Sequence, residues 1–137
     1  MRLLAVLALI VTAACGSESG PPLIISDLEV TRPMPGASMS AGYFLLENRS
    51  AEEITITRVD SAQFGRVEVH ETILENDVSK MRRLDALTIP ANGSVRLERG
   101  GKHLMLMRPA DNIDNVELGF YTSDGLVLSA ATRIAER

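Results

Sequence analysis

Cysteine is nearly absent from this chain of 137 residues: Cys15 is the only one, and tryptophan is missing altogether. A single cysteine cannot form an internal disulfide, so a domain of this length must be stabilised by its hydrophobic core. The residues that follow Cys15 also offer no thiolate. This excludes cysteine catalysis and argues against the cysteine-ligated blue-copper centre of electron-transfer proteins.

Basic residues are in the minority. Lys and Arg number 14 against 18 Asp and Glu, which gives a formal net charge of −4 at pH 7 with neutral histidines. Aromatic residues make up only 4% of the chain, and no basic stripe with interleaved aromatic residues is present. We therefore expect no nucleic-acid partner.

No hydrophobic run is long enough to span a bilayer as a helix. The N-terminus has one basic residue, Arg2, an apolar run at residues 3–11, and then three small residues before Cys15. This order predicts a secretory signal peptide over residues 1–14. The small residues before a lone cysteine also resemble the lipobox of bacterial lipoproteins, although Thr12 stands where leucine is usual.

We therefore expect a periplasmic or other extracytoplasmic protein that is anchored to a membrane by lipidation of Cys15. Export with cleavage at another point, and an incidental cysteine in a discarded peptide, are the alternatives. Residues 15–22 are a short tether rich in Gly, Ser and Pro, and residues 23–137 are the expected folded domain.

The rest of the chain lacks any 3.6-residue periodicity. Residues 53–60, for example, alternate Ile54 and Ile56 with Thr55 and Thr57, as a half-buried strand does. Turn residues recur throughout, and the pattern predicts an all-β sandwich of about nine short strands with Greek-key crossings, a barrel being the alternative. The expected strands span residues 23–31, 41–47, 53–60, 66–74, 78–84, 94–98, 103–107, 113–121 and 126–134, and residues 87–89 lead into a turn.

The strand at residues 103–107 combines core residues with metal ligands. Alternation directs Leu104 and Leu106 to one face, and His103, Met105 and Met107 to the other. An imidazole beside thioethers is a soft ligand set that suits Cu(I). The alternative is a strand buried on both faces, with His103 at its solvated end.

A second pair of ligands lies on a predicted hairpin. If Asn76 and Asp77 form its two-residue turn, Thr72 opposes Met81, and Met81 becomes a diagonal neighbour of His70. Diagonal neighbours lie roughly 7–8 Å apart, which is within reach of long side chains. Two imidazoles and two thioethers can then surround one Cu(I) if the two strand pairs meet, whereas Zn²⁺ and Ca²⁺ prefer other ligands.

Each of these residues also has a structural interpretation. Met81 is a candidate core gap-filler, His70 a candidate surface residue, and Met105 and Met107 are candidate core residues. The remaining polar and sulfur-containing residues nearby are interpreted as follows: Met34 and Met39 as packing or surface residues, and Glu68, Glu71 and Asp77 as solvated-face or turn residues.

The spacing of the four ligands resembles a known signature. Ten residues separate His70 from Met81, twenty-one separate Met81 from His103, and one separates His103 from Met105. This pattern is similar to that of the PCu(A)C-type periplasmic copper chaperones. Residues 25–48, 89–93 and 100–106 also resemble segments of that family. The chain departs from the family at residue 71, where Glu71 stands in place of a frequent methionine, and in its lack of an aromatic residue at 28–30.

The resemblance implies a cupredoxin-like β-sandwich that binds one Cu(I) through His70, Met81, His103 and Met105, with Met107 as a candidate auxiliary ligand. It implies a metallochaperone, not an enzyme, that delivers copper to a respiratory oxidase subunit or assembly factor during cytochrome c oxidase assembly. A lipid anchor is not general in the family. A copper-buffering or resistance lipoprotein and a metal-free β-sandwich interaction module are the alternatives.

Overall fold

The computed structural model describes residues 21–135, and these residues form strands and no helix. The predicted signal peptide, Cys15 and most of the predicted tether lie outside them. The part of the chain that is described accordingly contains no helix capable of crossing a membrane. The strands are β1 (Leu23–Thr31), β2 (Met39–Asn48), β3 (Ile54–Ile56), β4 (Arg58–Asp60), β5 (Phe64–Glu75), β6 (Val78–Leu84), β7 (Leu87–Ile89), β8 (Ser94–Leu97), β9 (Lys102–Pro109), β10 (Asn115–Thr122) and β11 (Gly125–Ala135).

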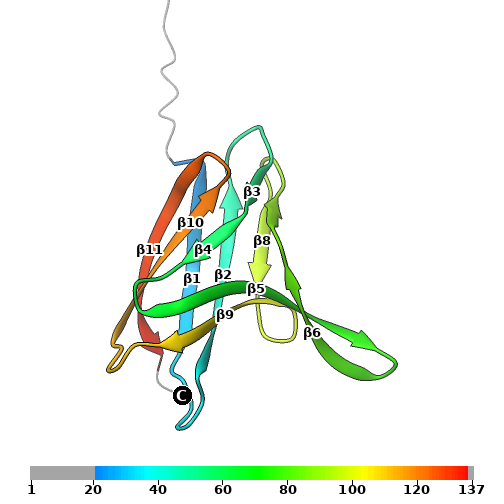
Figure 1. The fold of residues 1–137 in the computed structure, drawn as a ribbon. Coiled ribbons are helices and arrows are strands. Elements are labelled where there is room, and N and C mark those ends of the chain that lie inside the picture. The colour runs from blue at the N-terminus through cyan, green and yellow to red at the C-terminus, as the bar shows by residue number, and fades with distance from the viewer. Residues whose placement is uncertain (1–20, 136–137) are drawn as a thin grey trace, which may run out of the picture.

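Most of the strands belong to one folded-over sheet of order β4-β10-β11-β1-β2-β9-β5-β6. β2 pairs with β9 along its first half and with β8 along its second half, while β3 and β7 form a separate pair. β5 and β9 run across the direction of β1 and β2 (Figure 1). Neighbours that are distant in sequence, such as β1 with β11 and β2 with β9, provide the expected crossings. The predicted all-β sandwich is confirmed, with eleven strands in place of about nine.

The hydrophobic core lies inside the folded-over sheet, and β9 packs against it through two leucines. Leu104 and Leu106 are fully buried, as their alternation predicts. Gly42 of β2 lies opposite Leu104, and a Cβ atom there would lie 3.2 Å from the Cβ of Leu104 and 3.3 Å from Cδ1 of Leu106. A side chain at position 42 would thus press on both leucines, so glycine permits the close approach of β2 to β9.

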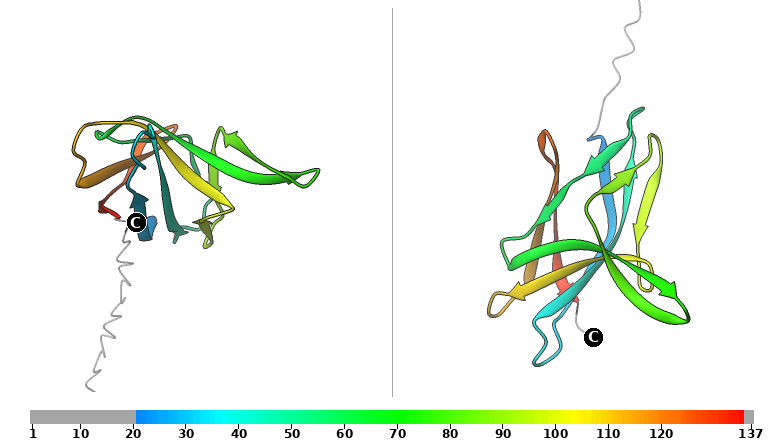
Figure 2. Two further views of the ribbon diagram at one scale, coloured as in Figure 1. Left: turned by 90° about the horizontal axis from the view of Figure 1, so that it is seen from below. Right: turned by 45° about the vertical axis from the view of Figure 1, so that its right-hand side comes forward.

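The β5–β6 hairpin projects from the body of the molecule (Figure 2). Asn76 and Asp77 connect its strands with φ values of 52° and 62°. Two central residues with positive φ are the mark of a type I′ turn, whose twist matches that of the flanking strands. The hairpin has the register that was predicted from this turn: Thr72 pairs with Met81, and His70 pairs with Arg83.

The prediction of one continuous strand over residues 53–60 is wrong. The amide of Thr57 donates a hydrogen bond to the carbonyl of Tyr121 at 2.8 Å, between β3 and β4. Before Thr57 the chain pairs with β7, and after it the chain pairs with β10. The alternation of Ile54 and Ile56 continues up to this change of partner, so it could not reveal the interruption.

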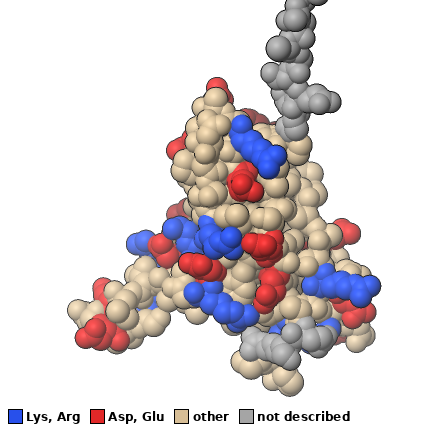
Figure 3. Space-filling model, turned by 180° about the vertical axis from the view of Figure 1, so that it is seen from behind, with Lys and Arg blue, Asp and Glu red and all other residues tan. Residues whose placement is uncertain are grey.

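The surface opposite the view of Figure 1 carries charges of both signs. Figure 3 shows basic and acidic side chains interleaved on this face, without a large patch of one sign. Two of the ion pairs reach β1 from the other side of β2: Arg96 of β8 with Asp27 at 3.3 Å, and Arg99, just after β8, with Glu29 at 3.1 Å. Such exposed pairs contribute little to stability, typically less than about 1 kcal/mol each.

Candidate metal centre

The two histidines of the chain face each other on neighbouring strands. His70 of β5 is the direct antiparallel partner of His103 of β9, and the centroids of their rings are 6.1 Å apart. Sequence spacing left open whether the two strand pairs meet. The pairing of β5 with β9 brings them together, and it places both imidazoles on one face of the sheet.

His103 has one ring nitrogen available. Its side chain is buried, with 6% of the residue exposed, and Nδ1 lies 3.1 Å from the carbonyl oxygen of Gly101. Because a carbonyl can only accept a hydrogen bond, Nδ1 carries the proton. A neutral imidazole has a single N–H, so Nε2 of His103 keeps the free lone pair that a metal ion needs.

His70 uses the opposite ring nitrogen as its hydrogen-bond donor. Its Nε2 lies 2.9 Å from Oε2 of Glu68, and an ionised carboxylate can only accept, so Nε2 is the donor. Nδ1 of His70 is then unprotonated in the neutral ring. This atom is buried and has no hydrogen-bond partner among the described residues. Buried polar atoms are rarely left without a partner, and an orphaned imidazole nitrogen beside a second histidine is an arrangement suited to a metal ion.

Glu68 is largely buried and paired on the face that carries the histidines. Its interpretation as a solvated-face residue is therefore wrong. Only 11% of its side chain is exposed, and it contacts Arg66 and Arg83 as well as His70. The pKa of Glu68 lies below its usual range. The main cause is the hydrogen bond from His70, and the nearby Arg66 and Arg83 lower the pKa further, whereas partial burial acts in the opposite direction. The signal available in the sequence was the two-residue spacing of Glu68 and His70 on one strand face.

The two methionines predicted as ligands flank the histidines on either side. Met105 lies two residues beyond His103 on the same face of β9, opposite Glu68 of β5. Met81 lies on β6 opposite Thr72, which is two residues from His70 on β5. Met81 is 63% exposed, so it is not a core gap-filler. All four predicted ligands thus share the face formed by β9, β5 and β6.

A pocket of about 670 Å³ opens on this face. We call it the methionine pocket, because it is lined by Met34, Met39, Met81 and Met105, together with His103. His70 is not among its lining residues. The interpretation of Met34 and Met39 as surface residues is correct, since they are 56% and 48% exposed, but sequence reasoning missed their place in the pocket. The pairing of β2 with β9 puts Met39 there.

Met107 lies further along β9. It pairs with Met39 of β2 on one side and with Arg66 of β5 on the other, and it is not a lining residue of the methionine pocket. It shares the face of Met105, as its alternation predicts. Its role as an auxiliary ligand stays a prediction.

Harder metal ions find no comparable site. In the region covered by residues 21–135, no group of three or more His, Cys, Asp or Glu side chains is placed to hold a metal ion. Zinc sites are built from these residue types, and calcium and magnesium sites from oxygen ligands. The chemistry that this face offers is therefore that of two imidazoles and several thioethers.

Solved structures with the same fold include copper-binding domains. The chain matches the copper-bound PCuAC domain from PmoF2 with a TM-score of 0.69 and 19% identity, over 85% of this chain and 94% of that one. It matches the Cu(I) form of DR1885 from Deinococcus radiodurans with a TM-score of 0.65 and 26% identity, over 88% and 82% of the two chains. The fold expected from the sequence resemblance is thereby confirmed.

Curated relatives are longer than this chain. RP573 of Rickettsia prowazekii, an uncharacterized protein, is 31% identical over 91 residues, which cover 64% of this chain and 50% of the relative. The putative lipoprotein Lxx21020 of Leifsonia xyli is 24% identical over 105 residues, covering 74% of this chain and 63% of the relative. The match to each relative thus covers less than two thirds of that relative's length.

A family model gives the assignment. The model of LpqE-like putative lipoproteins matches residues 23–125, from the first strand to the start of the last, and thus includes every residue of the candidate site. Together with the structural matches to PCuAC domains, this shows that the chain belongs to the LpqE-like family, with the PCuAC-type fold.

Proposed function

We propose that this protein is an extracytoplasmic copper chaperone that binds one Cu(I) through His70, Met81, His103 and Met105. The observation that carries the proposal is the direct pairing of His70 with His103, each with one ring nitrogen free. Met105 and Met81 add a thioether on each side of the pair. Their softness suits Cu(I), and thioethers persist in an oxidising compartment where paired thiols form disulfides.

The nitrogen ligands in this proposal are Nδ1 of His70 and Nε2 of His103. Glu68 and the carbonyl of Gly101 each accept a hydrogen bond from the other ring nitrogen, as carboxylates and carbonyls behind metal-binding histidines commonly do. All four ligands are uncharged, so the bound ion keeps its positive charge. The structural relatives support copper as the ion, because one is described as copper-bound and another as a Cu(I) form.

Delivery of the ion would begin at Met81. This residue is the most exposed of the proposed ligands and lies on the projecting hairpin (Figure 2). A ligand of an acceptor protein can approach and replace Met81 while the two histidines and Met105 still hold the ion. The acceptor we propose is a respiratory oxidase subunit or assembly factor that receives copper during cytochrome c oxidase assembly, and the chaperone itself catalyses no reaction.

Anaerobic titration with Cu(I) against a chromophoric chelator tests the site. The wild-type protein should compete for one equivalent, and His70→Ala and Met105→Leu should compete much less well. Met107→Leu tests the auxiliary ligand in the same assay. A wild-type protein that cannot compete would leave a metal-free interaction module. Variants that compete as well as wild type would refute the proposed ligand set.

Transfer separates delivery from storage. Copper-loaded protein is mixed with the copper-free soluble domain of an oxidase subunit, and the copper content of each is measured after separation. A chaperone gives up its ion to the oxidase domain. Retention by this protein would favour the alternative of a copper-buffering lipoprotein without a dedicated acceptor.

A further inference from the structure

We infer that Met34 and Met39, with Met105, form a second and weaker Cu(I) site at the rim of the methionine pocket, from which the ion passes to the histidines. Four of the five methionines among residues 21–135 line this one pocket, and the proposed chaperone site uses only Met81 and Met105. The inference rests on the proposed function, because the two sites share Met105.

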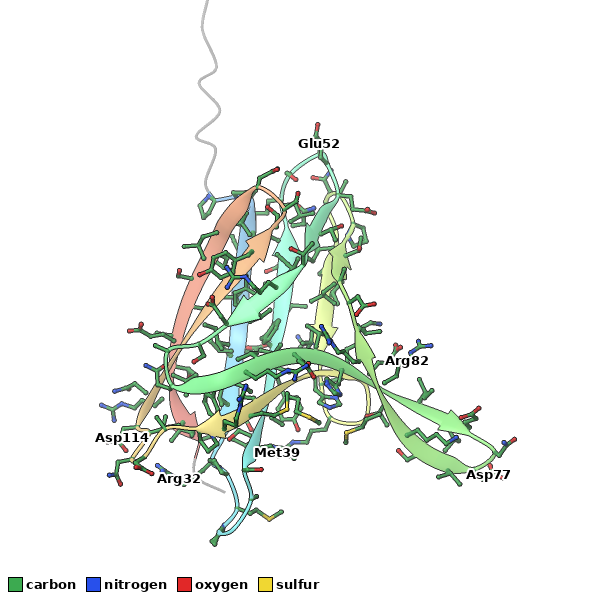
Figure 4. All side chains as sticks on the ribbon, viewed as in Figure 1. Arg32, Met39, Glu52, Asp77, Arg82 and Asp114 are labelled. Atoms are coloured by element: carbon green, nitrogen blue, oxygen red, sulfur yellow. The ribbon has the colours of Figure 1, made fainter. Side chains whose placement is uncertain are left out.

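The sheet places Met39 within reach of Met105. Ala41 of β2 is the direct partner of Met105, and Met39 is two residues before Ala41 on the same face. Met39 is therefore the diagonal neighbour of Met105, at a spacing of roughly 7–8 Å that long side chains bridge. Figure 4 labels Met39 at the end of β2 that lies beside β9.

A tight turn fixes Met34 at the same rim. The amide of Ala37 donates a hydrogen bond to the carbonyl of Met34 at 2.8 Å, with Pro35 and Gly36 between them. Gly36 has a φ of 80°, as the third residue of a type II turn requires, and proline favours the second position. The turn leads directly into β2, so the positions of Met34 and Met39 are coupled through a short and constrained segment.

The exposure of these two methionines argues against a packing role. Met34 and Met39 are about half exposed, whereas a methionine that fills a core gap is buried. They are also neutral in a pocket where none of the described lining residues carries a carboxylate. The one charged lining residue, Arg99, is paired with Glu29 at 3.1 Å and lies over the ring of Tyr43.

These features select a soft monovalent ion. Hard cations require oxygen ligands, which the lining side chains supply poorly, and thioethers bind Cu(I) without any need for deprotonation. An ion held by Met34, Met39 and Met105 already has one ligand of the histidine site. It moves inward when His103 and His70 replace Met34 and Met39, with no change in the oxidation state of copper.

Methyl NMR of the full chain, labelled with [methyl-¹³C]methionine, tests the inference. The signals of the five methionines among residues 21–135 are assigned by single Met→Leu substitutions, and Cu(I) is added anaerobically. We expect the first equivalent to shift Met81 and Met105. The second finds Met105 already engaged, is held more weakly for that reason, and should shift Met34 and Met39. A second equivalent that leaves Met34 and Met39 unmoved, or shifts Met107 in their place, would overturn the inference.

Leucine substitutions separate sulfur ligation from an apolar contact. Leucine keeps the size and hydrophobicity of methionine but lacks the sulfur atom. Met34→Leu and Met39→Leu should each weaken binding of the second equivalent by about tenfold or more. Mutation of a residue that merely supports a metal ligand already costs about tenfold in affinity, and loss of a ligand should cost at least as much. Leu126→Ala, which alters an exposed apolar residue that does not line the pocket, is the control and should leave the second equivalent unchanged. Unchanged binding in both rim variants would assign these methionines to an apolar surface instead.

A variant without the hairpin ligands distinguishes failure of this inference from failure of the proposed function. In His70→Ala/Met81→Leu, a single equivalent of Cu(I) should shift Met34, Met39 and Met105. If it shifts neither Met34 nor Met39, the rim site is absent even where the wild-type protein binds its first equivalent as proposed. If the first equivalent in wild type shifts Met34 and Met39 but not Met81, the rim site stands and the proposed chaperone site fails.

Discussion

The imidazole of His70 donates through Nε2 to Oε2 of Glu68, 2.9 Å away, from two positions further along the same strand face. This bond decides which nitrogen of His70 remains free for a metal ion. Arg66 and Arg83 hold the same carboxylate, so its orientation is set by three partners. Glu68 therefore orients His70, and in the proposed site it would act on copper only through that histidine.

Removal of Glu68 should lower copper affinity without removing a ligand. We expect Glu68→Ala to weaken Cu(I) binding by about 10- to 100-fold, the usual range when the hydrogen-bond partner of a metal-binding histidine is removed. The measurement is anaerobic competition with a chromophoric chelator. The ¹⁵N shifts of the His70 ring in the metal-free protein report the tautomer directly, and they should change in the same variant.

Glu71 provides the matched control. It also forms two ion pairs, with Arg82 at 2.9 Å and with Lys102 at 3.3 Å, but alternation puts it on the opposite face of β5. Glu71→Ala should leave both the copper affinity and the ring shifts of His70 unchanged. Equal losses in the two variants would mean that the strand is disturbed in general and that Glu68 has no specific role.

The sequence was sufficient to predict the part of the candidate site that lies on the β5–β6 hairpin, but not its contact with β9. The turn at Asn76 and Asp77 was recognisable from residue type, and it fixed the position of Met81 relative to His70 because a two-residue hairpin allows one register. The meeting of His70 with His103 depends on the pairing of β5 with β9, which joins segments about thirty residues apart. No local pattern specifies that pairing, and only the family spacing pointed to it.

The dependence on distant pairing partners also explains two wrong predictions, the continuous strand over residues 53–60 and the solvated Glu68. The division between β3 and β4 arises from partners that lie elsewhere in the chain, and the burial of Glu68 arises from Arg66, Arg83 and His70 around it. Alternation distinguishes two faces of a strand but cannot tell what covers the polar one. Met39 was overlooked for this reason, since its neighbours on β9 were unknown from its own segment.

The metal-free protein should lose stability in acid. The hydrogen bond from His70 lowers the pKa of Glu68, and hydrogen bonds from Arg82 and Lys102 lower that of Glu71. A carboxyl whose pKa is lower in the folded protein stabilises it above the ordinary glutamate value and ceases to do so as pH falls through the folded pKa. We expect the free energy of unfolding to fall as pH decreases from about 5 to about 3. Urea unfolding across this range measures the effect.

Glutamine variants identify the groups responsible for that loss. Glu68→Gln and Glu71→Gln cannot titrate, so each should be less stable than wild type at neutral pH and should lose less stability on acidification. A wild-type stability curve that is flat over the same range, or variants with an unchanged slope, would contradict the assignment of these two carboxylates.

The proposed lipid anchor on Cys15 is tested in cells. We expect the full chain to appear in the membrane fraction, and Cys15→Ser to appear in the soluble extracytoplasmic fraction, because serine cannot accept the lipid through a thioether. Mass spectrometry of the mature N-terminus measures the modification and the cleavage point together. An unmodified N-terminus elsewhere in the first 22 residues would support plain export instead.

Copper binding and folding should respond to residues on opposite faces of the sheet. Leu104→Ala removes a fully buried side chain between His103 and Met105, and we expect it to destabilise the fold by about 2–5 kcal/mol. Met81→Leu alters an exposed position and should change stability by less than about 0.5 kcal/mol. We expect the order to reverse for copper, because of these two residues only Met81 is a proposed ligand. Under conditions in which both variants are folded, Met81→Leu should weaken Cu(I) binding more than Leu104→Ala does. If Leu104→Ala weakens Cu(I) binding more, copper affinity depends on the packing of β9 and Met81 is not a ligand.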